Sequence, residues 1–418
     1  SVERYWKLDF SKPDSPAGDG EWLDALDELL AQATRDRLVS DVPLGAFLSG
    51  GIDSSLVVSY MAEAASRVAT FSIDFPHGGF SEARHARQVA SIYGTDHTDM
   101  LVEPRSIPTL MESVRFAGEP FADASAIPTY LLSGMTRRNV TVALSGDGGD
   151  EAFAGYERHK VAAYADRLGR GPAALGGLGR RIGGGDQHNR RGRLGRGLEA
   201  MSLPSHERYA TIMAHFDPST LEDVATADFL EAAGDATRAW RQTLAAPALA
   251  GVDRYIALDT ATYLPDDLLL KVDRMSMAHA LEVRSPLLDY RVHELAASLP
   301  TNYKPRGRQT KWALRQLARR RGVPARLAQR RKQGFSVPVG DWFRGELRGW
   351  VEDVLLDPAT TARGYFQEEG VRGMLEDHAQ ARADHGDRLF NLAALELWHR
   401  AFIDRAVPEA APTARHWG

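Results

Sequence analysis

The chain has 418 residues, with 51 Lys and Arg against 56 Asp and Glu, which gives a net charge of −5 when histidine is neutral. The absence of cysteine excludes disulfides, thiolate metal sites and a cysteine nucleophile within this chain. At about 150 residues per domain, the length predicts two or three domains, and the mild negative charge gives no general bias toward nucleic acid. No stretch approaches the ~18 apolar residues that a membrane-spanning helix needs, and the first residues do not form a signal peptide, so we expect a cytoplasmic protein without a membrane anchor.

Alternating strands and helices are predicted for residues 44–155, the pattern of a doubly wound parallel sheet with helices on both faces. A turn is expected at His77–Gly79, and Ser81 is expected to cap a helix that ends at Gly94. The predicted strands are 45–48, 68–75, 98–102 and 140–144, and the predicted helices are 54–65, 81–93, 106–117 and 127–139.

The second half of the sequence has a different character. Residues 167–197 are dominated by Gly and Arg and lack apolar periodicity, so a mobile loop is expected there. Helix-spaced apolar residues predict a mainly helical region after that loop, followed by a frayed tail. The expected organisation is a linker-like segment and helix at 1–40, a core domain at 41–160, an insert at 161–204, a helical part at 205–405 and a tail at 406–418.

A run from Lys304 to Lys332 contains many basic residues and no acidic one. Such a run is commonly a solvated helix face. The alternative is a wall that faces a polyanion such as a polyphosphate.

The first motif is Leu48-Ser-Gly-Gly-Ile-Asp-Ser-Ser55, between a predicted strand and a helix. Consecutive glycines let the backbone approach a phosphate, and the helix N-terminus supplies free N–H groups. Asp53 is a natural ligand for a magnesium ion that bridges phosphate oxygens. The GKS or GKT ending of a Walker A loop and the GxGxxG pattern are both absent, although a structural Ser-Gly-Gly turn remains the alternative.

The second motif, Ala143-Leu-Ser-Gly-Asp-Gly-Gly-Asp-Glu151, also follows a predicted strand. Loops at the carboxyl ends of neighbouring strands converge in a doubly wound sheet, so this loop is expected to face the first one. Asp150 would then complete a metal site with Asp53. A Gly/Asp-rich surface turn is the alternative.

With both motifs in view, the sequence resembles a known family. SGGIDSS is similar to the pyrophosphate loop of the N-type ATP pyrophosphatases, which include the asparagine, GMP, NAD and argininosuccinate synthetases, and SGDGGDE resembles the SGEGxDE loop of asparagine synthetases. The resemblance is to the synthetase domain of class B asparagine synthetases and covers residues 1–405. Three other stretches share it: the strand Thr70–Phe75, the segment Lys271–Asp289 with LEVRSPLLD, and Arg331–Pro338 with the family's catalytic-lysine loop.

This resemblance implies an α/β fold of the adenine-nucleotide alpha-hydrolase (PP-loop) type with a mostly helical C-terminal part, and ATP and Mg²⁺ as cofactors. It implies that Lys332 stabilises charge on the phosphates and that Asp147, an Asp where the family has Glu, acts on the amine or positions the intermediate. The remaining implied roles are adenosine contacts for Leu48, Ile73 and Gly146, pyrophosphate binding for Ser49, Gly50, Gly51, Asp53 and Ser54, further nucleotide contacts for Ser55 and Ser145, and magnesium binding for Asp53 and Asp150.

The acceptor acid is assigned less directly. Lys271, Glu282 and Arg284 match family positions near it, but a Glu-x-Arg pair on a helix before Pro286 is also a pattern that holds a fold together. Leu268 stands where some asparagine synthetases have Asp.

The implied reaction is adenylation of a carboxylate, most simply L-aspartate, with release of pyrophosphate, followed by attack of ammonia or an amine to give asparagine and AMP. The alternative within the class is a relative that acts on another carboxylate, such as a cell-wall, peptide or antibiotic precursor, as β-lactam synthetases and lasso peptide cyclases do. A tRNA-thiolating pyrophosphatase is disfavoured by the absence of Cys and the presence of SGDGGDE, and a non-catalytic nucleotide-binding subunit by Asp53, Asp150 and Lys332. The family's N-terminal glutaminase domain is not expected within this chain. The protein partners left open are a separate or removed glutaminase domain and a second copy of the chain in a homo-oligomer. No nucleic-acid partner is expected.

Overall fold

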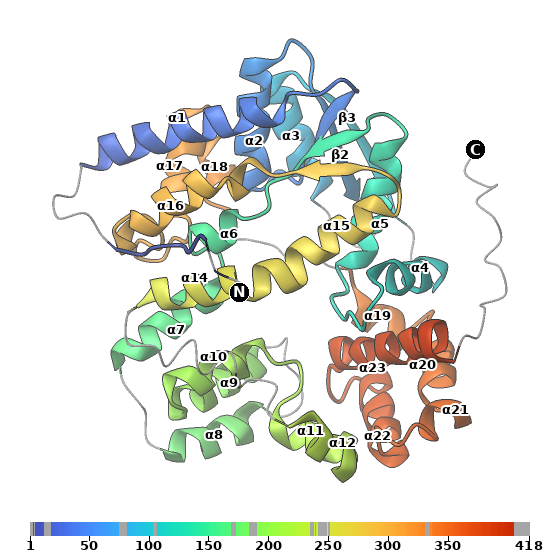
Figure 1. Cartoon of the computed structure of the whole chain (residues 1–418). Coiled ribbons are helices and arrows are strands. Elements are labelled where there is room, and N and C mark those ends of the chain that lie inside the picture. The colour runs from blue at the N-terminus through green and yellow to red at the C-terminus, as the bar shows by residue number, and fades with distance from the viewer. Residues whose placement is uncertain are drawn as a thin grey trace. The chain divides into compact units, whose positions relative to one another are not determined.

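The computed structural model describes residues 3, 5–11, 18–74, 82–102, 107–168, 173–183, 190–234, 238, 240, 249, 251–330, 335 and 337–404 (Figure 1). The chain forms two compact units that interleave along the sequence. Unit 1 comprises residues 1–103, 128–168 and 243–335, and unit 2 comprises residues 104–127, 169–242 and 336–418.

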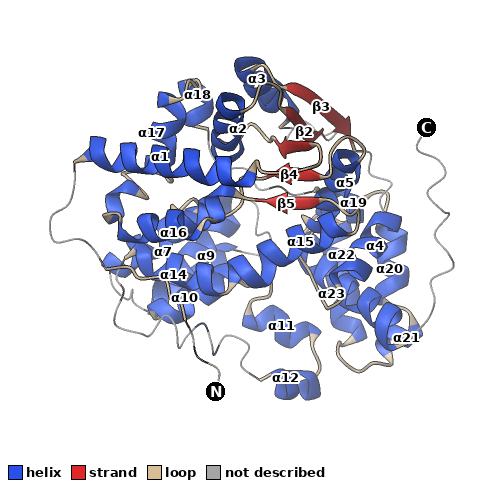
Figure 2. Cartoon of the chain, turned by 45° about the horizontal axis from the view of Figure 1, so that its top comes forward, coloured by secondary structure: helices blue, strands red, loops and turns tan. Residues whose placement is uncertain are grey.

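Unit 1 contains a five-stranded parallel sheet with the order β3-β2-β1-β4-β5 (Figure 2). The predicted doubly wound parallel sheet is confirmed. Its strands are β1 (Leu44–Phe47), β2 (Ala69–Asp74), β3 (Asp96–Leu101), β4 (Val142–Leu144) and β5 (Glu282–Arg284). Residues in β1 and β4 are mostly buried and apolar, as expected for strands covered on both faces.

Helices of unit 1 surround this sheet. Helix α1 packs on α2, and α2 packs on α17, with Leu26, Leu56 and Leu314 buried in their shared core. Its helices are α1 (Asp19–Arg37), α2 (Ile52–Ala64), α3 (Ala83–Tyr93), α5 (Ala126–Arg137, of which the first two residues fall in unit 2), α6 (Gly149–Ala152), α7 (Glu157–Leu168), α14 (Val252–Ala261), α15 (Leu270–Met277), α16 (Tyr290–Ser298), α17 (Trp312–Arg320) and α18 (Ala325–Ala328). A π-helical turn, η1 (Leu264–Leu269), lies between α14 and α15, and two short 3₁₀ helices are η2 (Pro286–Leu288) and η3 (Thr301–Tyr303).

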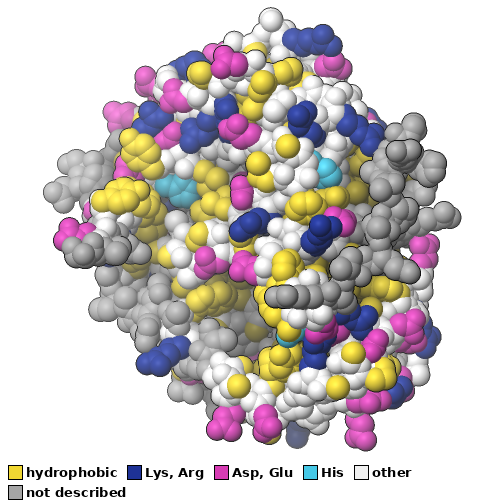
Figure 3. Space-filling view, turned by 45° about the vertical axis from the view of Figure 1, so that its right-hand side comes forward, with side chains coloured by type: hydrophobic (Ala, Val, Ile, Leu, Met, Phe, Trp, Pro, Cys, Tyr) yellow, Lys and Arg dark blue, Asp and Glu magenta, His cyan; other side chains and the backbone are white. Residues whose placement is uncertain are grey.

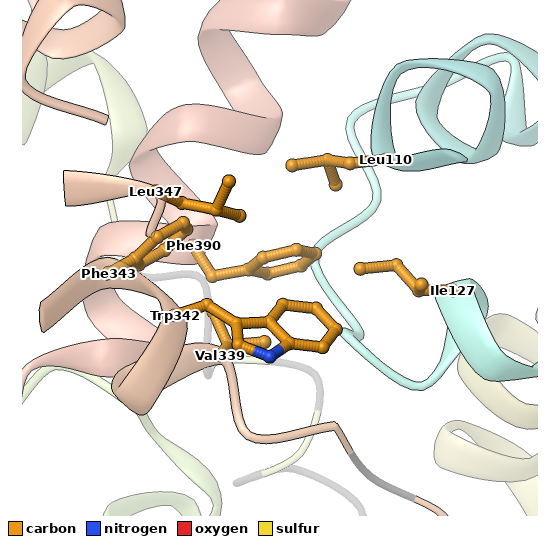
Figure 4. Close-up of a pocket in the computed structure, with 7 residues that line it drawn as sticks. All are labelled: Leu110, Ile127, Val339, Trp342, Phe343, Leu347 and Phe390. Carbon is orange, nitrogen blue, oxygen red and sulfur yellow. The ribbon is translucent and has the colours of Figure 1, made fainter. Parts of the chain in front are cut away.

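Unit 2 is helical in its described residues. Helix α23 is its centre, because α4, α19, α20 and α22 all pack on it. Its elements are α4 (Ile107–Ala117), α8 (Ala173–Gly183), α9 (Arg190–Ser202), α10 (Ser205–Met213), α11 (Pro218–Val224), α12 (Ala227–Ala233), α19 (Val339–Arg344), α20 (Arg348–Leu355), α21 (Pro358–Thr361), α22 (Glu368–Ala379), α23 (Gly386–Trp398) and the π-helical η4 (His399–Ile403). An apolar pocket in this unit is lined by Leu110, Ile127, Val339, Trp342, Phe343, Leu347 and Phe390 (Figure 4).

Two expectations about secondary structure were wrong. The stretch 167–197 contains helices α8 and α9, which pack on each other where a loop was expected. The helices approach closely at Gly179, where a Cβ would lie 2.5 Å from the Gly195 carbonyl oxygen. The two helices therefore meet through backbone at this point rather than through an apolar side chain. Glu282 and Arg284 lie on strand β5 and not on a helix.

Other expectations agree closely or fall on residues that are not described. Helix α3 ends at Gly94, which has the left-handed conformation expected of a helix C-cap. Ser81, the turn at His77–Gly79 and the tail after residue 404 lie outside the described residues. Among the described residues, no helix combines the length and the apolarity needed to cross a membrane.

Candidate functional site

The candidate site lies where the direction of winding of the sheet reverses. The chain runs from β1 to β2 and β3 on one side, and then places β4 on the other side of β1. In open α/β sheets, ligands bind outside the carboxyl ends of the strands at such a reversal. The loops that follow β1 and β4 carry the two sequence motifs.

The loop after β1 is held by its own serines. The Ser49 hydroxyl accepts a hydrogen bond from the Gly51 N–H at 3.2 Å and lies 3.1 Å from the Ser54 hydroxyl. Gly51 caps helix α2 without a side-chain hydrogen bond. The N–H groups in the first turn of this helix therefore point toward the carboxyl edge of the sheet, which is the arrangement of an anion site.

Gly50 cannot be replaced without strain. Its φ of 72° lies in the left-handed region, and a Cβ would stand 2.5 Å from the His85 carbonyl carbon at the start of α3. The predicted need for glycine in this loop thus has two physical causes, a positive φ and a close approach of backbone.

The loop after β4 packs directly against the first loop. A Cβ on Gly146 would lie 2.8 Å from the Ser54 nitrogen and 2.9 Å from the Asp53 Cβ. The expectation that the two loops meet is therefore correct. Ser145 is fixed on the other side, because its N–H donates to the Arg284 carbonyl on β5 at 2.9 Å.

Asp53 and Asp150 converge on one cation, the ammonium group of Lys311. The Lys311 Nζ lies 2.7 Å from Asp150 Oδ1 and also forms an ion pair with Asp53. The Lys311 side chain is only 5% exposed. Burial alone would lower its pKa, but the negative charges of Asp150 and Asp53 outweigh burial and raise the pKa of Lys311, so the lysine is protonated at neutral pH.

The backbone around Lys311 is held from both sides. The Trp312 N–H donates to the Lys304 carbonyl at 2.8 Å, and Lys304 forms a buried ion pair with Asp253 at 2.6 Å. The buried Arg315 donates to the Thr310 carbonyl at 2.6 Å and to the Arg330 carbonyl at 3.2 Å. Arg315 therefore links the residue before Lys311 to the segment that leads into Lys332.

A buried polar cluster supports the helix that carries Asp150. The Tyr156 hydroxyl donates to Glu151, and the Arg158 guanidinium lies 3.6 Å from the Tyr156 ring centre. His159 is buried against Asp259 at 2.7 Å, and burial lowers the pKa of His159 despite this carboxylate. Glu151, the last residue of the second motif, thus has a structural role, because it accepts the hydrogen bond from Tyr156.

Asp147 is partly buried and oriented by two serines. Its carboxylate accepts a hydrogen bond from the Ser145 hydroxyl at 2.8 Å, and its backbone carbonyl accepts one from the Ser285 hydroxyl at 2.6 Å. One face of the carboxylate is therefore fixed at the carboxyl edge of β4.

The predicted adenosine contacts lie on the neighbouring strands. Leu48 continues β1 by donating its N–H to the Phe71 carbonyl at 2.8 Å, and Ile73 is buried two residues beyond the Phe47–Phe71 pair of the register. Both residues therefore lie at the same edge as the two loops. Ser55, in the first turn of α2, is fully buried.

The predicted acceptor-acid residues have different surroundings. Arg284 donates to the carbonyls of Arg37 and Val39 at 3.0 and 2.8 Å and pairs with Glu282 at 2.6 Å, so its guanidinium secures the connection from α1 to β1. Lys271 is buried near the start of α15. Lys332 lies outside the described residues.

The described part of the basic run matches neither a helix face that only contacts solvent nor a surface that is left unpaired to bind a polyanion. Its side chains reach acidic residues elsewhere in unit 1: Arg306 pairs with Asp19, Arg320 with Asp24, and Arg330 with Glu82. On the face of the molecule shown in Figure 3, basic and acidic side chains are likewise interspersed.

Lys311 is the site residue that sequence reasoning missed. It is one basic residue among many in the sequence, and only its proximity in space to Asp53 and Asp150 distinguishes it. Gly155 was missed for the same reason: a Cβ there would overlap both the Asp150 carboxylate and the Lys311 side chain. Its sequence context, a Thr-Lys pair directly before the amphipathic helix WALRQLARR, does not distinguish Lys311 from the other basic residues of the run.

The site suits a magnesium ion that is bound by two protein carboxylates and completes its coordination with ligands from outside the protein. Two carboxylates from adjacent loops already surround one positive charge, and magnesium is commonly bound by one or two carboxylates together with waters and substrate phosphates. Within the described ranges, no group of three or more His, Asp and Glu side chains forms a complete protein cage for a metal. Asp53 and Asp150 are thus the residues that would hold the ion.

Comparison with known proteins agrees with this geometry. The family model described as asparagine synthase matches residues 25–400. The chain is 31% identical over 385 residues to asparagine synthetase [glutamine-hydrolyzing] 1 of Bacillus subtilis, covering 88% of this chain and 58% of that protein. It is also 31% identical over 424 residues to a putative asparagine synthetase [glutamine-hydrolyzing] of Mycobacterium tuberculosis, covering 97% of this chain and 62% of that protein.

A more distant relative has a different name. Amidase chry2 of Gibberella zeae is 23% identical, with 89% of this chain and 61% of that protein covered. The chain thus spans about three fifths of the length of each of these three relatives. The match of the family model over most of the sequence, including both loops of the candidate site, shows that the chain belongs to the asparagine synthase family.

Proposed function

We propose that this chain is an ATP-dependent ligase that adenylates a substrate carboxylate, most simply that of L-aspartate, and transfers the acyl group to ammonia. The observation that carries the proposal is the contact of the two loops at the reversal of the sheet. Gly146 lies against Asp53 and Ser54, and the carboxylates of Asp53 and Asp150 meet at one point. Such a site suits a nucleotide triphosphate with a divalent cation.

In this proposal the first loop holds the pyrophosphate portion of ATP through Ser49, Gly50, Gly51 and Ser54. Backbone N–H groups at the start of α2 supply donors and a favourable dipole. Magnesium bound by Asp53 and Asp150 would neutralise phosphate charge. Leu48, Ile73 and Gly146 would contact the adenosine, with Ser55 and Ser145 nearby.

A carboxylate is a poor electrophile at neutral pH, so its activation as an acyl adenylate divides the condensation into two easier steps. A carboxylate oxygen attacks the α-phosphorus, the bond to the β-phosphate oxygen breaks, and pyrophosphate leaves. Ammonia then attacks the carbonyl carbon and AMP leaves with the bridging oxygen. Lys332 would stabilise the charge that grows on the phosphates in the first step.

Asp147 is proposed to act in the second step. Its carboxylate is oriented by Ser145 and lies in the loop that also carries Gly146. It would accept a proton from the attacking amine or hold the intermediate in position. The substrate-binding roles of Lys271, Glu282 and Arg284 stay predictions.

A second candidate is the same chemistry on a different carboxylate. Leu268 replaces the Asp of some asparagine synthetases, and the neighbouring Asp266 and Asp267 lie in the π-helical turn η1. Such turns occur often at functional sites. The distant relative named as an amidase is a further reason to test other carboxylates.

The nitrogen source is also a proposal. The relatives from Bacillus subtilis and Mycobacterium tuberculosis are named as glutamine-hydrolyzing. We propose that this chain accepts ammonia, either free or released from glutamine by a glutaminase domain or a separate glutaminase chain.

Isotope transfer tests the adenylation directly. L-aspartate labelled with ¹⁸O in its side-chain carboxylate is incubated with ATP, magnesium and ammonium, and the AMP is analysed by mass spectrometry. Adenylation predicts one ¹⁸O in AMP for each amide formed. Label in inorganic phosphate and none in AMP would indicate an acyl phosphate and would refute the proposed mechanism.

A further inference from the structure

The segment that precedes α1 is attached to unit 1 at two described points. Near its start, the Trp6 indole N–H donates to the Glu294 carboxylate on α16 at 2.9 Å. Near its end, the partly buried Phe10 packs against a small buried cluster that consists of Ala154, Val252 and Ile256. The last two of these residues belong to α14, so the segment runs past α16 and α14, as the dark blue trace in Figure 1 shows.

Phe10 also lies beside a buried ion pair. The Lys304 ammonium is 5.5 Å from the centre of the Phe10 ring and 2.6 Å from the Asp253 carboxylate. The Lys304 side chain is 0% exposed. A buried ion pair keeps its strength only while water is excluded, and the face of an aromatic ring attracts an ammonium group. The Phe10 ring therefore helps to keep water away from Lys304 and Asp253.

The first contact of Phe10 leads to Asp150. Ala154 has a φ of 53°, in the left-handed region, and such a backbone persists only where its surroundings enforce it. The next residue, Gly155, donates its N–H to the Asp150 carbonyl at 2.8 Å, and a Cβ on Gly155 would overlap the Asp150 carboxylate. A shift of Ala154 would therefore reach the carboxylate that we propose to bind magnesium.

The second contact leads to the ion-pair partner of Asp150. The Lys304 carbonyl accepts the Trp312 N–H at 2.8 Å, and Trp312 directly follows Lys311. The Lys311 ammonium lies 2.7 Å from Asp150 Oδ1. The Phe10 ring therefore supports both partners of this ion pair, one through each of its two contacts.

We propose that Phe10 is a positioning residue of the candidate site, which acts through Ala154 and Lys304 rather than by contact with a substrate. Loss of the ring leaves a gap beside Ala154 and admits water to the pair of Lys304 and Asp253, so both supports of Asp150 loosen together. A displacement of about 1 Å in a site can cost up to ~100-fold in rate. The proposal rests on the proposed function only in its effect on magnesium and ATP.

The test compares Phe10→Ala and Phe10→Leu with the wild type and with Trp6→Ala, all in the full chain. Leucine keeps an apolar side chain that fills most of the gap. Trp6→Ala is the matched control, because it removes the other attachment of the same segment and leaves Phe10 in place. Hydrogen exchange of the Gly155 and Trp312 amides is followed by mass spectrometry with residue resolution. Pyrophosphate release is measured as a function of magnesium concentration.

Phe10→Ala should raise the exchange rate of the Gly155 and Trp312 amides by about tenfold or more, because the carbonyls that hold them become mobile. It should lower kcat by about tenfold and raise the magnesium concentration at half-maximal rate by about threefold or more. A variant that is only less stable would lose the same fraction of its activity at every magnesium concentration. Phe10→Leu and Trp6→Ala should stay within about threefold of the wild type in all three quantities.

Unchanged exchange of both amides in Phe10→Ala, a magnesium dependence equal to that of the wild type, or effects as large in Trp6→Ala would each overturn the proposal. If Phe10→Ala fails to fold, Phe10→Val leaves a smaller gap and should show the same changes in reduced size; wild-type behaviour of that variant would contradict the proposal as well. Failure of the wild type to release pyrophosphate would count against the proposed function, and the exchange of the two amides would still decide the role of Phe10.

Discussion

Gly146 approaches Asp53 so closely that no side chain fits between them: a Cβ on Gly146 would lie 2.9 Å from the Asp53 Cβ. This contact joins the loop after β4 to the loop after β1 at the reversal of the sheet. The same contact positions the neighbouring Asp147 and the two carboxylates that we propose to bind magnesium, those of Asp53 and Asp150. The first prediction follows from it.

Gly146→Ala should separate the two loops and weaken ATP binding by about tenfold or more, with a loss of stability of about 1–3 kcal/mol from overpacking. The measurements are calorimetric titration with ATP and urea unfolding. Gly373→Ala is the control, because Gly373 is exposed on α22 and a Cβ there meets nothing within 4 Å. That control should be stabilised by up to about 1 kcal/mol. Wild-type ATP affinity in Gly146→Ala would contradict the close contact.

Arg315→Lys should impair both stability and turnover. The buried guanidinium donates to the carbonyls of Thr310, Ala328 and Arg330, and an ammonium group cannot reach all three. Leaving buried carbonyls unsatisfied costs about 1–3 kcal/mol each, so we expect about 2 kcal/mol of destabilisation. Because Thr310 precedes Lys311 and Arg330 leads into Lys332, we also expect kcat to fall about tenfold or more.

Arg319→Lys is the control for that variant, since Arg319 is exposed on the same helix. Urea unfolding and steady-state kinetics of the two variants give the comparison. If Arg315→Lys behaved like Arg319→Lys in both measurements, the carbonyl contacts would not hold this segment.

His293 should make the protein less stable in mild acid. Burial lowers the pKa of His293 to about 4, although a hydrogen bond with the Leu287 backbone and the charge of Asp289 oppose this. An unfolded histidine titrates near pH 6.5, so between about pH 6.5 and pH 4 the unfolded state binds more protons than the folded state. The free energy of unfolding should therefore decrease as the pH is lowered through this window. The contribution of this residue is at most about 3 kcal/mol.

The measurement is urea unfolding of the wild type and of His293→Gln at several pH values between 7 and about 4.5. The glutamine variant should show a smaller slope, since it cannot take up the proton. Parallel curves for the two proteins would show that His293 does not titrate in this window.

Arg284→Met separates two roles that the sequence allows for Arg284. Its bonds to the carbonyls of Arg37 and Val39 indicate that it holds the connection between α1 and β1. We expect a loss of stability of about 1–3 kcal/mol and a KM for the acceptor acid within about threefold of the wild type. A selective rise of KM by tenfold or more, with little loss of stability, would assign Arg284 to the acceptor acid instead.

The parts of the site that could be predicted from sequence are those encoded locally. Ser49–Ser55 and Ser145–Glu151 each combine a strand end, glycines and a carboxylate within a few residues, so their placement at the sheet edge followed from the alternation of elements. Lys311 could not be predicted, because its role depends on a contact with Asp53 across more than 250 residues and it is one of many basic residues in the run from Lys304 to Lys332.

The same distinction between local sequence patterns and contacts between elements explains the two errors in the predicted secondary structure. Strand β5 is only three residues long and is defined by its pairing with β4. The sequence Glu-Val-Arg alone does not predict this pairing. Helices α8 and α9 approach each other closely at Gly179, where a Cβ would lie 2.5 Å from the Gly195 carbonyl oxygen, and the many glycines and arginines of this stretch argued against a helix. In both cases the determining interaction is a contact between two elements, which the sequence of either element alone does not encode.

The most direct test of the central claim is pyrophosphate release from ATP and magnesium, with L-aspartate and ammonium chloride added separately and together. We predict that release depends on aspartate, that asparagine and AMP form when ammonium is also present, and that Lys332→Ala abolishes the release. Measurable ATP binding without aspartate-dependent release would contradict L-aspartate as the substrate, and absence of ATP binding would contradict the assignment of the two loops.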